Sequence, residues 1–376
     1  MEGALDKTLM LLFFLLIGFI IRKKFKSKEQ VNGIKNMILT IALPATIFVA
    51  LMGVEIEASM LVYPALALLF NLVLYVLTPT LLRAFGVRVN SKEGRTLRLL
   101  IPSLAPGLSC FPFIIEFLGE TELAIAALAD LGNKVFVLLV LYLIAMNLFL
   151  ANNHKLGDAG KNEKLKSLLL SLVKEPINMV IFAAITFISF GVQLTDLPGF
   201  LSNAFQRMGG MMTPLILIFI GLAVTVKRKR LLPIFTLLIS RAGLSMLIVG
   251  IMCMILGVKN SNTMLLGLAF ALSSCSFWPF AHMASFDQKE ERPTSKGKTF
   301  DLNYGLLVLA ISLPVSSILI LTVLNSGKAL ASNTSVIIMG VSLILLALVP
   351  QLIRRVKLLI RIASKAKITA ALETAD

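Results

Sequence analysis

The feature that most constrains this chain is a series of apolar runs, each about 20 residues long and flanked by polar residues. A helix of that length spans the hydrocarbon core of a bilayer, which is about 30 Å thick. Of the 376 residues, 57% are hydrophobic and only 15% are charged, which excludes a soluble enzyme. Eleven runs predict transmembrane segments at residues 5–21, 36–53, 60–82, 99–118, 122–150, 167–191, 208–225, 231–256, 262–285, 301–324 and 335–353.

Lysine and arginine residues gather in alternate loops of this pattern. The formal net charge is +16, and 30 of the 36 Lys and Arg residues follow the odd-numbered spans. The opposite side carries Lys7, Arg207, Lys259 and Lys328. By the positive-inside rule we expect an integral protein of the plasma (inner) membrane, with its N-terminus outside and its C-terminus in the cytoplasm. The same distribution explains the positive charge without a nucleic-acid partner.

The two halves of the chain align with each other, with Pro44 opposite Pro214 and Pro64 opposite Pro233. Each unit has five spans, so the second unit enters the bilayer from the opposite face. The alternative is a chance alignment of apolar helices. The sequence thus predicts an all-α polytopic membrane protein with an inverted 5+5 repeat. The predicted parts are a first repeat at 1–150, a cytoplasmic linker at 151–166, a second repeat at 167–326, and an additional transmembrane helix with a basic cytoplasmic tail at 327–376.

Spans four and nine carry residues that interrupt a helix. Proline lacks an N–H and clashes with the preceding turn, so backbone groups are freed, and these are tolerated in a membrane only inside protein or along a wet cavity. Two interrupted helices that cross near the midplane direct half-helix N-termini at an anion, although simple kinking is the alternative. The predicted substrate-binding residues are Pro106, Gly107, Ser109, Cys110 and Pro112 in span four, and Ser273, Ser274, Cys275, Ser276 and Pro279 in span nine.

Charged and amide side chains also fall inside the spans. Arg241 lies about 14 Å into span eight, opposite Asn71 in the repeat, and both are predicted to contact substrate. A guanidinium suits a carboxylate, whereas the alternative is an internal salt bridge. Asp130 and Lys134 share a helix face and are expected to neutralise each other. If they face a cavity instead, Asp130, with Asn133, Lys134 and Asn303, forms a candidate H⁺ or Na⁺ coupling site.

Motifs for catalysis are missing. The sequence has no HExxH, Walker A or CxxC pattern, and its three cysteines lie in apolar segments. We therefore predict no catalytic residues, no metal, no cofactor and no enzymatic activity. The sequence leaves open whether the protein forms a homodimer.

Three stretches resemble the auxin efflux carrier family of permeases. They are Leu15 to Leu51, with a basic turn and a Leu-Pro-Ala core, Phe117 to Lys134, and Met212-Thr213-Pro214-Leu215. The resemblance covers residues 9–325. It implies a PIN-like architecture, similar to bile-acid symporters and sodium–proton antiporters, with crossed broken helices four and nine. It also implies organic-anion substrates.

The chain departs from this family in one place. Members commonly have Asn and Gly ahead of the helix-four proline, whereas this sequence reads Ala105-Pro106-Gly107-Leu108-Ser109. Ser109 takes the place of the polar amide. The function predicted is a secondary transporter of small organic anions that works by alternating access. The alternative is a membrane receptor or scaffold that binds a small ligand in the same cavity without transporting it.

Overall fold

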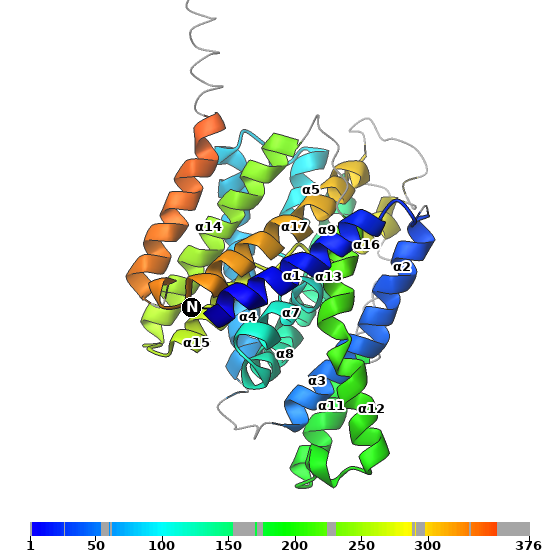
Figure 1. Cartoon of the computed structure of the whole chain (residues 1–376). Helices are drawn as coiled ribbons and strands as arrows, with labels where there is room; N and C mark the ends of the chain where they lie inside the picture. Colours follow the sequence, from blue (N-terminus) through cyan, green and yellow to red (C-terminus); the bar gives the residue numbers. More distant parts are fainter. Residues whose placement is uncertain are drawn as a thin grey trace, which may run out of the picture.

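The computed structural model describes residues 2–25, 27–53, 60, 62–152, 170, 176–223, 231–287, 290, 298–330 and 332–351 (Figure 1). These residues form helices joined by turns and loops, without a β-strand among them. Seven helices are long and apolar enough to cross a membrane, and three shorter apolar helices accompany them. The protein is an all-α polytopic membrane protein, as its sequence predicts.

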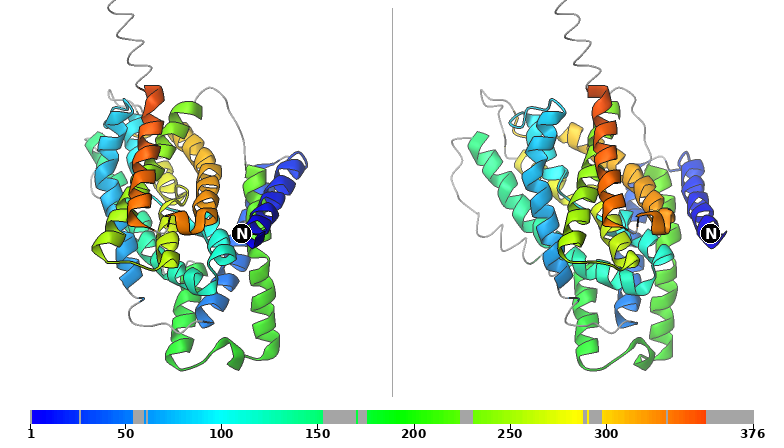
Figure 2. Two further views of the ribbon diagram at one scale, coloured as in Figure 1. Left: turned by 60° about the vertical axis from the view of Figure 1, so that its left-hand side comes forward. Right: turned by 90° about the vertical axis from the view of Figure 1, so that its left-hand side faces the viewer.

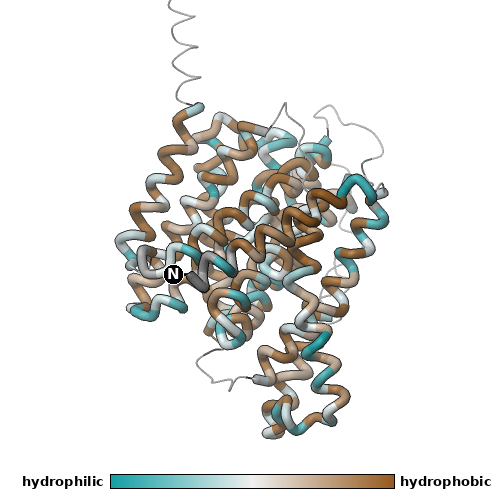
Figure 3. Tube along the Cα trace, viewed as in Figure 1, coloured by the Kyte–Doolittle hydropathy of each residue, from teal (hydrophilic) through white to brown (hydrophobic). Residues whose placement is uncertain are grey.

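Apolar residues run along most of the helices, as the brown segments in Figure 3 show, and many of their side chains are exposed. Val76, Ile318 and Leu346 are each more than 60% exposed although they lie in the middle of long helices. A water-soluble protein rarely leaves so much contiguous apolar surface uncovered. Lipid acyl chains are the solvent that suits these faces, so the chain is an integral membrane protein.

Six helices form what we call the first helix group. Within this group, α1 packs along α13, and α3 packs between α11 and α12 (Figures 1 and 2). Gly18 and Gly221 lie where α1 meets α13, and a Cβ on Gly18 would overlap the carbonyl of Ile218, so glycine allows this close approach. The group contains α1 (Glu2–Ile21), α2 (Lys28–Met37), α3 (Leu43–Met52), α11 (Pro176–Ser189), α12 (Gly199–Gly210) and α13 (Met212–Ala223).

Predicted spans two and seven begin earlier than their hydropathy suggests. Helix α2 already starts at Lys28, because the Ser27 hydroxyl accepts a hydrogen bond from the N–H of Gln30 while the Gln30 side chain accepts one from the N–H of Ser27. It continues through a π-helical turn, Ile38–Ala42, into α3. The seventh predicted span likewise begins at Gly199. Polar first turns hide such helix starts from a search for apolar runs.

The remaining repeat helices form the second helix group. Helix α4 packs along α8, and α17 contacts α5, α14 and α15. The two groups contact each other mainly through α3 against α8. The second group contains α4 (Val62–Ala84), α5 (Lys92–Leu100), α6 (Pro106–Ser109), α7 (Phe111–Phe117), α8 (Glu120–Val135), α9 (Leu141–Asn152), α14 (Leu231–Ile255), α15 (Ser261–Ala271), α16 (Trp278–Asp287) and α17 (Leu302–Ser326).

A further helix, Asn333–Gln351, stands beside α14 at one side of the molecule (Figures 1 and 2). Gly340 lies against the backbone carbonyl of Gly243, and a Cβ on Gly340 would come within 2.8 Å of that oxygen. Only 17% of the apolar stretch of this helix is buried, so lipid surrounds most of it. The predicted linker beyond Asn152 and the basic tail at 352–376 lie outside the described residues.

The order of the helices allows the pairing that the predicted repeat requires, and the repeat itself stays a prediction. Helices α1, α2–α3, α4, α5–α7 and α8–α9 are matched by α11, α12–α13, α14, α15–α16 and α17. Both predicted interruptions are confirmed, because α5 ends at Leu100 before α6 begins at Pro106, and α15 ends at Ala271 before α16 begins at Trp278. The opposite orientation of the two units in a membrane stays a prediction.

Candidate functional site

The two interruptions, residues 101–105 and 272–277, meet and bond to each other through their backbones. The N–H of Ala105 donates to the carbonyl of Ser274 at 2.8 Å. In return, the N–H of Ser274 donates to Ser109 Oγ at 2.9 Å, and the N–H of Ser276 donates to Ser103 Oγ at 3.0 Å. Groups that the broken helices leave unpaired are therefore satisfied across the crossing, which lets non-helical backbone persist inside the membrane.

Arg241 of α14 binds both interruptions at once. Its Nε donates to the carbonyl of Ile101 at 2.7 Å, Nη2 to that of Ser103 at 3.1 Å, and Nη1 to that of Ser273 at 2.9 Å. The side chain is 2% exposed. A fork of five N–H donors can hold several oxygens in fixed positions, which a lysine cannot do. Three of those donors are engaged with backbone carbonyls in this conformation.

The position of Arg241 balances the helix dipoles. Ile101 and Ser273 follow the C-terminal ends of half-helices α5 and α15, where unpaired carbonyls carry partial negative charge. The guanidinium neutralises both ends. Of the half-helices that continue from the crossing, α6 begins at Pro106, which has no N–H, so its N-terminal amides are those of Gly107 and Leu108. The first N–H of α16, on Trp278, donates to Ser276 Oγ.

Few residues of the crossing are accessible. Ala105, Gly107 and Leu108 are partly exposed, and Phe277 is 50% exposed beside the partly exposed Trp278. The other predicted substrate-binding residues of the two spans are buried: Pro106, Ser109, Cys110, Pro112, Ser273, Ser274, Cys275, Ser276 and Pro279.

Two of these buried side chains differ in how they are bonded. Ser109 Oγ is engaged twice, since it also donates to the carbonyl of Ala105 at 2.8 Å. The hydroxyl of Ser273, in contrast, is buried and has no hydrogen-bond partner in the described part of the chain.

Helix α6 also faces the first helix group. A Cβ on Gly107 would lie 2.9 Å from Leu43 Cδ2 of α3. The first exposed turn after the crossing is therefore at the contact between the two groups.

A buried chain of amides connects the crossing to α4 and α8. Asn71 Nδ2 donates to Asn133 Oδ1 at 3.0 Å, and Asn133 Nδ2 donates to the carbonyl of Leu104 at 3.1 Å and to Asp130 Oδ1 at 2.8 Å. Asn71 is fully buried, and its Oδ1 lacks a hydrogen-bond partner among the described residues. Asn71 therefore lies within this network rather than on the accessible surface of the crossing.

Asp130 and Lys134 form the ion pair that their spacing predicts. Lys134 Nζ lies 3.5 Å from Asp130 Oδ2, with side chains 7% and 4% exposed. The same Nζ donates to Asn178 Oδ1 at 2.9 Å. Because Asn178 belongs to α11, this bond joins the second helix group to the first. Asn178 is not among the site residues that the sequence predicts. The sequence marks it only as one amide side chain inside an apolar span.

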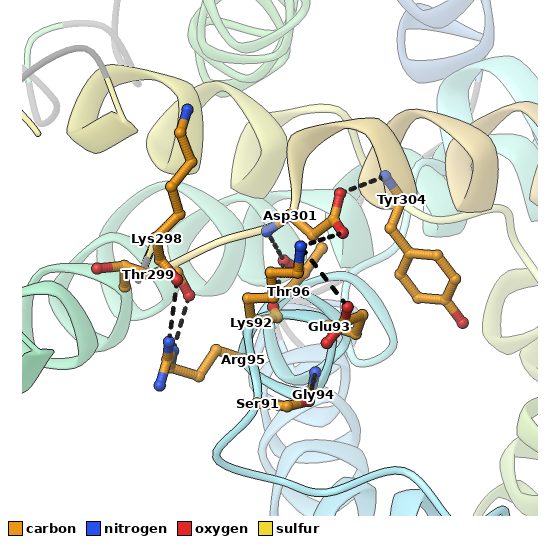
Figure 4. Close-up of polar contacts among 10 residues, drawn as sticks. All are labelled: Ser91, Lys92, Glu93, Gly94, Arg95, Thr96, Lys298, Thr299, Asp301 and Tyr304. Atoms are coloured by element: carbon orange, nitrogen blue, oxygen red, sulfur yellow. Dashed lines mark hydrogen bonds and ion pairs between the residues drawn. The ribbon is translucent and has the colours of Figure 1, made fainter. Parts of the chain in front are cut away.

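Asn303 is separated from Asp130, Asn133 and Lys134. It lies in the exposed first turn of α17 and lines a cavity of about 1150 Å³ with the start of α5 and the end of α9. Figure 4 shows the polar contacts at this rim, where Lys92 Nζ lies 3.5 Å from Asp301 Oδ2 and Arg95 Nε donates to the carbonyl of Thr299 at 2.7 Å. The structure brings the other three predicted coupling residues together, but not this one.

Metal-binding clusters of three or more His, Cys, Asp or Glu side chains do not occur among the described residues. The three cysteines, Cys110, Cys253 and Cys275, are buried and free. The polar groups at the crossing are amides, hydroxyls and one guanidinium. These are hydrogen-bonding and charge-stabilising groups.

No protein-family profile matches the chain. It is similar to a curated protein named as an uncharacterized transporter, from Methanocaldococcus jannaschii. The two sequences are 24% identical over 229 residues, which span 59% of this chain and 70% of that protein. The polytopic helical chain with two crossed, interrupted helices is thus similar to a protein named as a transporter.

Proposed function

We propose that this protein is a membrane transporter rather than an enzyme, and that it moves small organic anions by alternating access. The observation that carries the proposal is the asymmetric crossing. Arg241 binds the carbonyls that follow α5 and α15, while the amides of Gly107 and Leu108 at the start of α6 donate to no carboxylate in the described part of the chain. An anion suits these amides. The similarity to a protein named as a transporter supports the class.

The substrate site in this proposal lies on the exposed side of the crossing. The backbone amides of Gly107 and Leu108 supply donors, and Phe277 and Trp278 supply apolar surface. The predicted serine and proline residues contribute by fixing this backbone. Most small-molecule sites combine apolar surface with a few fixed polar groups in the same way.

Alternating access requires the two helix groups to move relative to each other, because the site lies between them. The second group holds both interruptions, so it carries the site as a unit. Its contact with the first group is crossed by the hydrogen bond from Lys134 to Asn178. We assign H⁺ or Na⁺ coupling to Asp130 in a second conformation, in which its ion pair with Lys134 is separated, because the buried carboxylate then needs another cation.

The finer assignments also belong to the proposal. Membership of the auxin efflux carrier family, an outside N-terminus and the plasma membrane follow from the resemblance and from the loop charges. Under this proposal the two repeats are inverted, and the crossing then lies near the membrane midplane.

Transport measurements test the proposal directly. Purified protein in liposomes, preloaded with unlabelled succinate or butyrate, should accumulate the corresponding labelled anion by counterflow. A receptor would bind either anion saturably without counterflow. Absence of both binding and counterflow for a panel of carboxylates, at several pH values and with or without Na⁺, would refute the organic-anion assignment.

A further inference from the structure

A lysine of the first helix group lies beside the exposed part of the crossing. Lys35 lies in the last turn of α2, and its Nζ is 4.8 Å from the centroid of the Phe277 ring. Phe277 is the last residue of the second interruption, next to the first residue of α16. This contact therefore joins the first helix group to the crossing itself.

Lys35 is also differently bonded from the other cations near the crossing. Arg241 is engaged with three backbone carbonyls, and Lys134 is engaged with Asp130 and Asn178. Within the described part of the chain, no carboxylate lies within 4.0 Å of Lys35 Nζ. An aromatic face attracts an ammonium but accepts no conventional hydrogen bond, so the N–H donors of Lys35 can still bind a ligand oxygen.

The ring that Lys35 covers is exposed enough to bind a ligand. Phe277 is 50% exposed, and its ring lies 5.4 Å from that of Phe280, so an aromatic surface continues from the crossing along α16. Lys35 itself is only partly exposed. A half-buried ammonium beside apolar rings interacts more strongly with an anion than one in bulk water does, because the local dielectric constant is lower.

We propose that Lys35 and Phe277 form the subsite that binds the carboxylate of the transported anion. The inference rests on the proposed function and gives Lys35 the ligand role that the sequence assigns to Arg241. Since the two residues belong to different helix groups, an anion whose carboxylate meets the Lys35 ammonium and whose apolar part meets the Phe277 ring contacts both sides of the moving interface. Binding here is therefore sensitive to the relative position of the groups.

The chain offers a direct probe of this subsite. Trp278 is its single tryptophan and follows Phe277. Quenching of its fluorescence by iodide, an anion, is compared with quenching by neutral acrylamide, for protein in dodecyl maltoside, which carries no phosphate. We expect Lys35→Met to lower the iodide quenching constant about fivefold and to leave the acrylamide constant unchanged. Lys35→Arg should retain iodide quenching, and Lys259→Met, at an exposed position, should behave as the wild type.

Butyrate and succinate are the carboxylate probes. Either should protect Trp278 from iodide in the wild type and in Lys35→Arg, but not in Lys35→Met. Equal iodide quenching in the wild type and Lys35→Met, or a Trp278 that acrylamide does not reach, would overturn the subsite. Iodide sensitivity without carboxylate protection would overturn its carboxylate assignment. Anionic lipid that removes the iodide effect when added to the detergent would identify a lipid-headgroup site instead.

The quenching and transport results separate the two proposals. Loss of carboxylate protection in Lys35→Met, with counterflow absent in the wild type, supports the subsite and removes the transport function. Counterflow with the same apparent affinity in the wild type and Lys35→Met removes the subsite and leaves the transport function standing.

Discussion

Replacing Arg241 by methionine tests whether this residue holds the crossing together. The substitution keeps an unbranched apolar side chain and removes the guanidinium with all its donors. Three buried carbonyl oxygens, on Ile101, Ser103 and Ser273, then lose their partner. Each buried acceptor without a partner costs about 1–3 kcal/mol. The guanidinium itself costs several kcal/mol to bury, and its removal offsets part of that loss.

We therefore expect Arg241→Met to lower the free energy of unfolding by about 3–5 kcal/mol, because the three losses are coupled rather than additive. Arg241→Lys keeps the charge but offers one nitrogen in place of three. We therefore expect its free energy of unfolding to lie between those of Arg241→Met and the wild type. Thermal melting of the purified proteins in neutral detergent measures both variants.

Arg207→Met is the matched control, because Arg207 is exposed in the last turn of α12. It should change stability by no more than about 0.5 kcal/mol. A melting temperature of Arg241→Met equal to that of the wild type would contradict this role of Arg241. If this variant has an unchanged melting temperature and also loses counterflow, Arg241 is a substrate ligand, as the sequence suggests, and not a clamp on the crossing.

Three further predictions concern other contacts. Ser109→Ala leaves the N–H of Ser274 without its acceptor and should cost about 1–3 kcal/mol, whereas Ser202→Ala, at a partly exposed position, should be close to neutral in the same melting assay. Lys134→Met leaves the buried Asp130 carboxylate without its cation and should lower the free energy of unfolding by about 3–5 kcal/mol. Adding Asp130→Asn should recover part of that loss, and additive losses in the double variant would contradict a coupled pair. Gly340→Leu forces the last helix away from α14 and should cost about 1–3 kcal/mol in a melting curve, with an unchanged curve contradicting the close packing.

Prolines and serines made the crossing predictable from sequence. Pro102 lies inside the first interruption and Pro106 begins the helix that follows it, while Ser273 to Ser276 lie inside the second, so local sequence identifies both places. Asp130 and Lys134 were predictable as a pair because they lie four residues apart on one helix. Each of these predictions uses residues that are neighbours along the chain.

Partners from distant segments could not be predicted in this way. Asn178 binds Lys134 across 44 positions of the chain, and Arg241 binds Ile101 across 140. A sequence pattern places a polar residue inside a span, but does not specify which carbonyl, carboxylate or amide it meets. The same limit explains why Lys35 was counted only as a loop charge.

The sequence by itself determined the membrane class, the approximate helix positions and the two interruptions, because the length of apolar runs and the chemistry of proline act locally. Only the tertiary structure decided the partners of the buried polar groups. In the low-dielectric interior each such group must find a hydrogen bond, and the packing of helices from both halves of the chain decides which one is within reach. That packing gives Arg241 the carbonyls and leaves Lys35 at the exposed ring of Phe277.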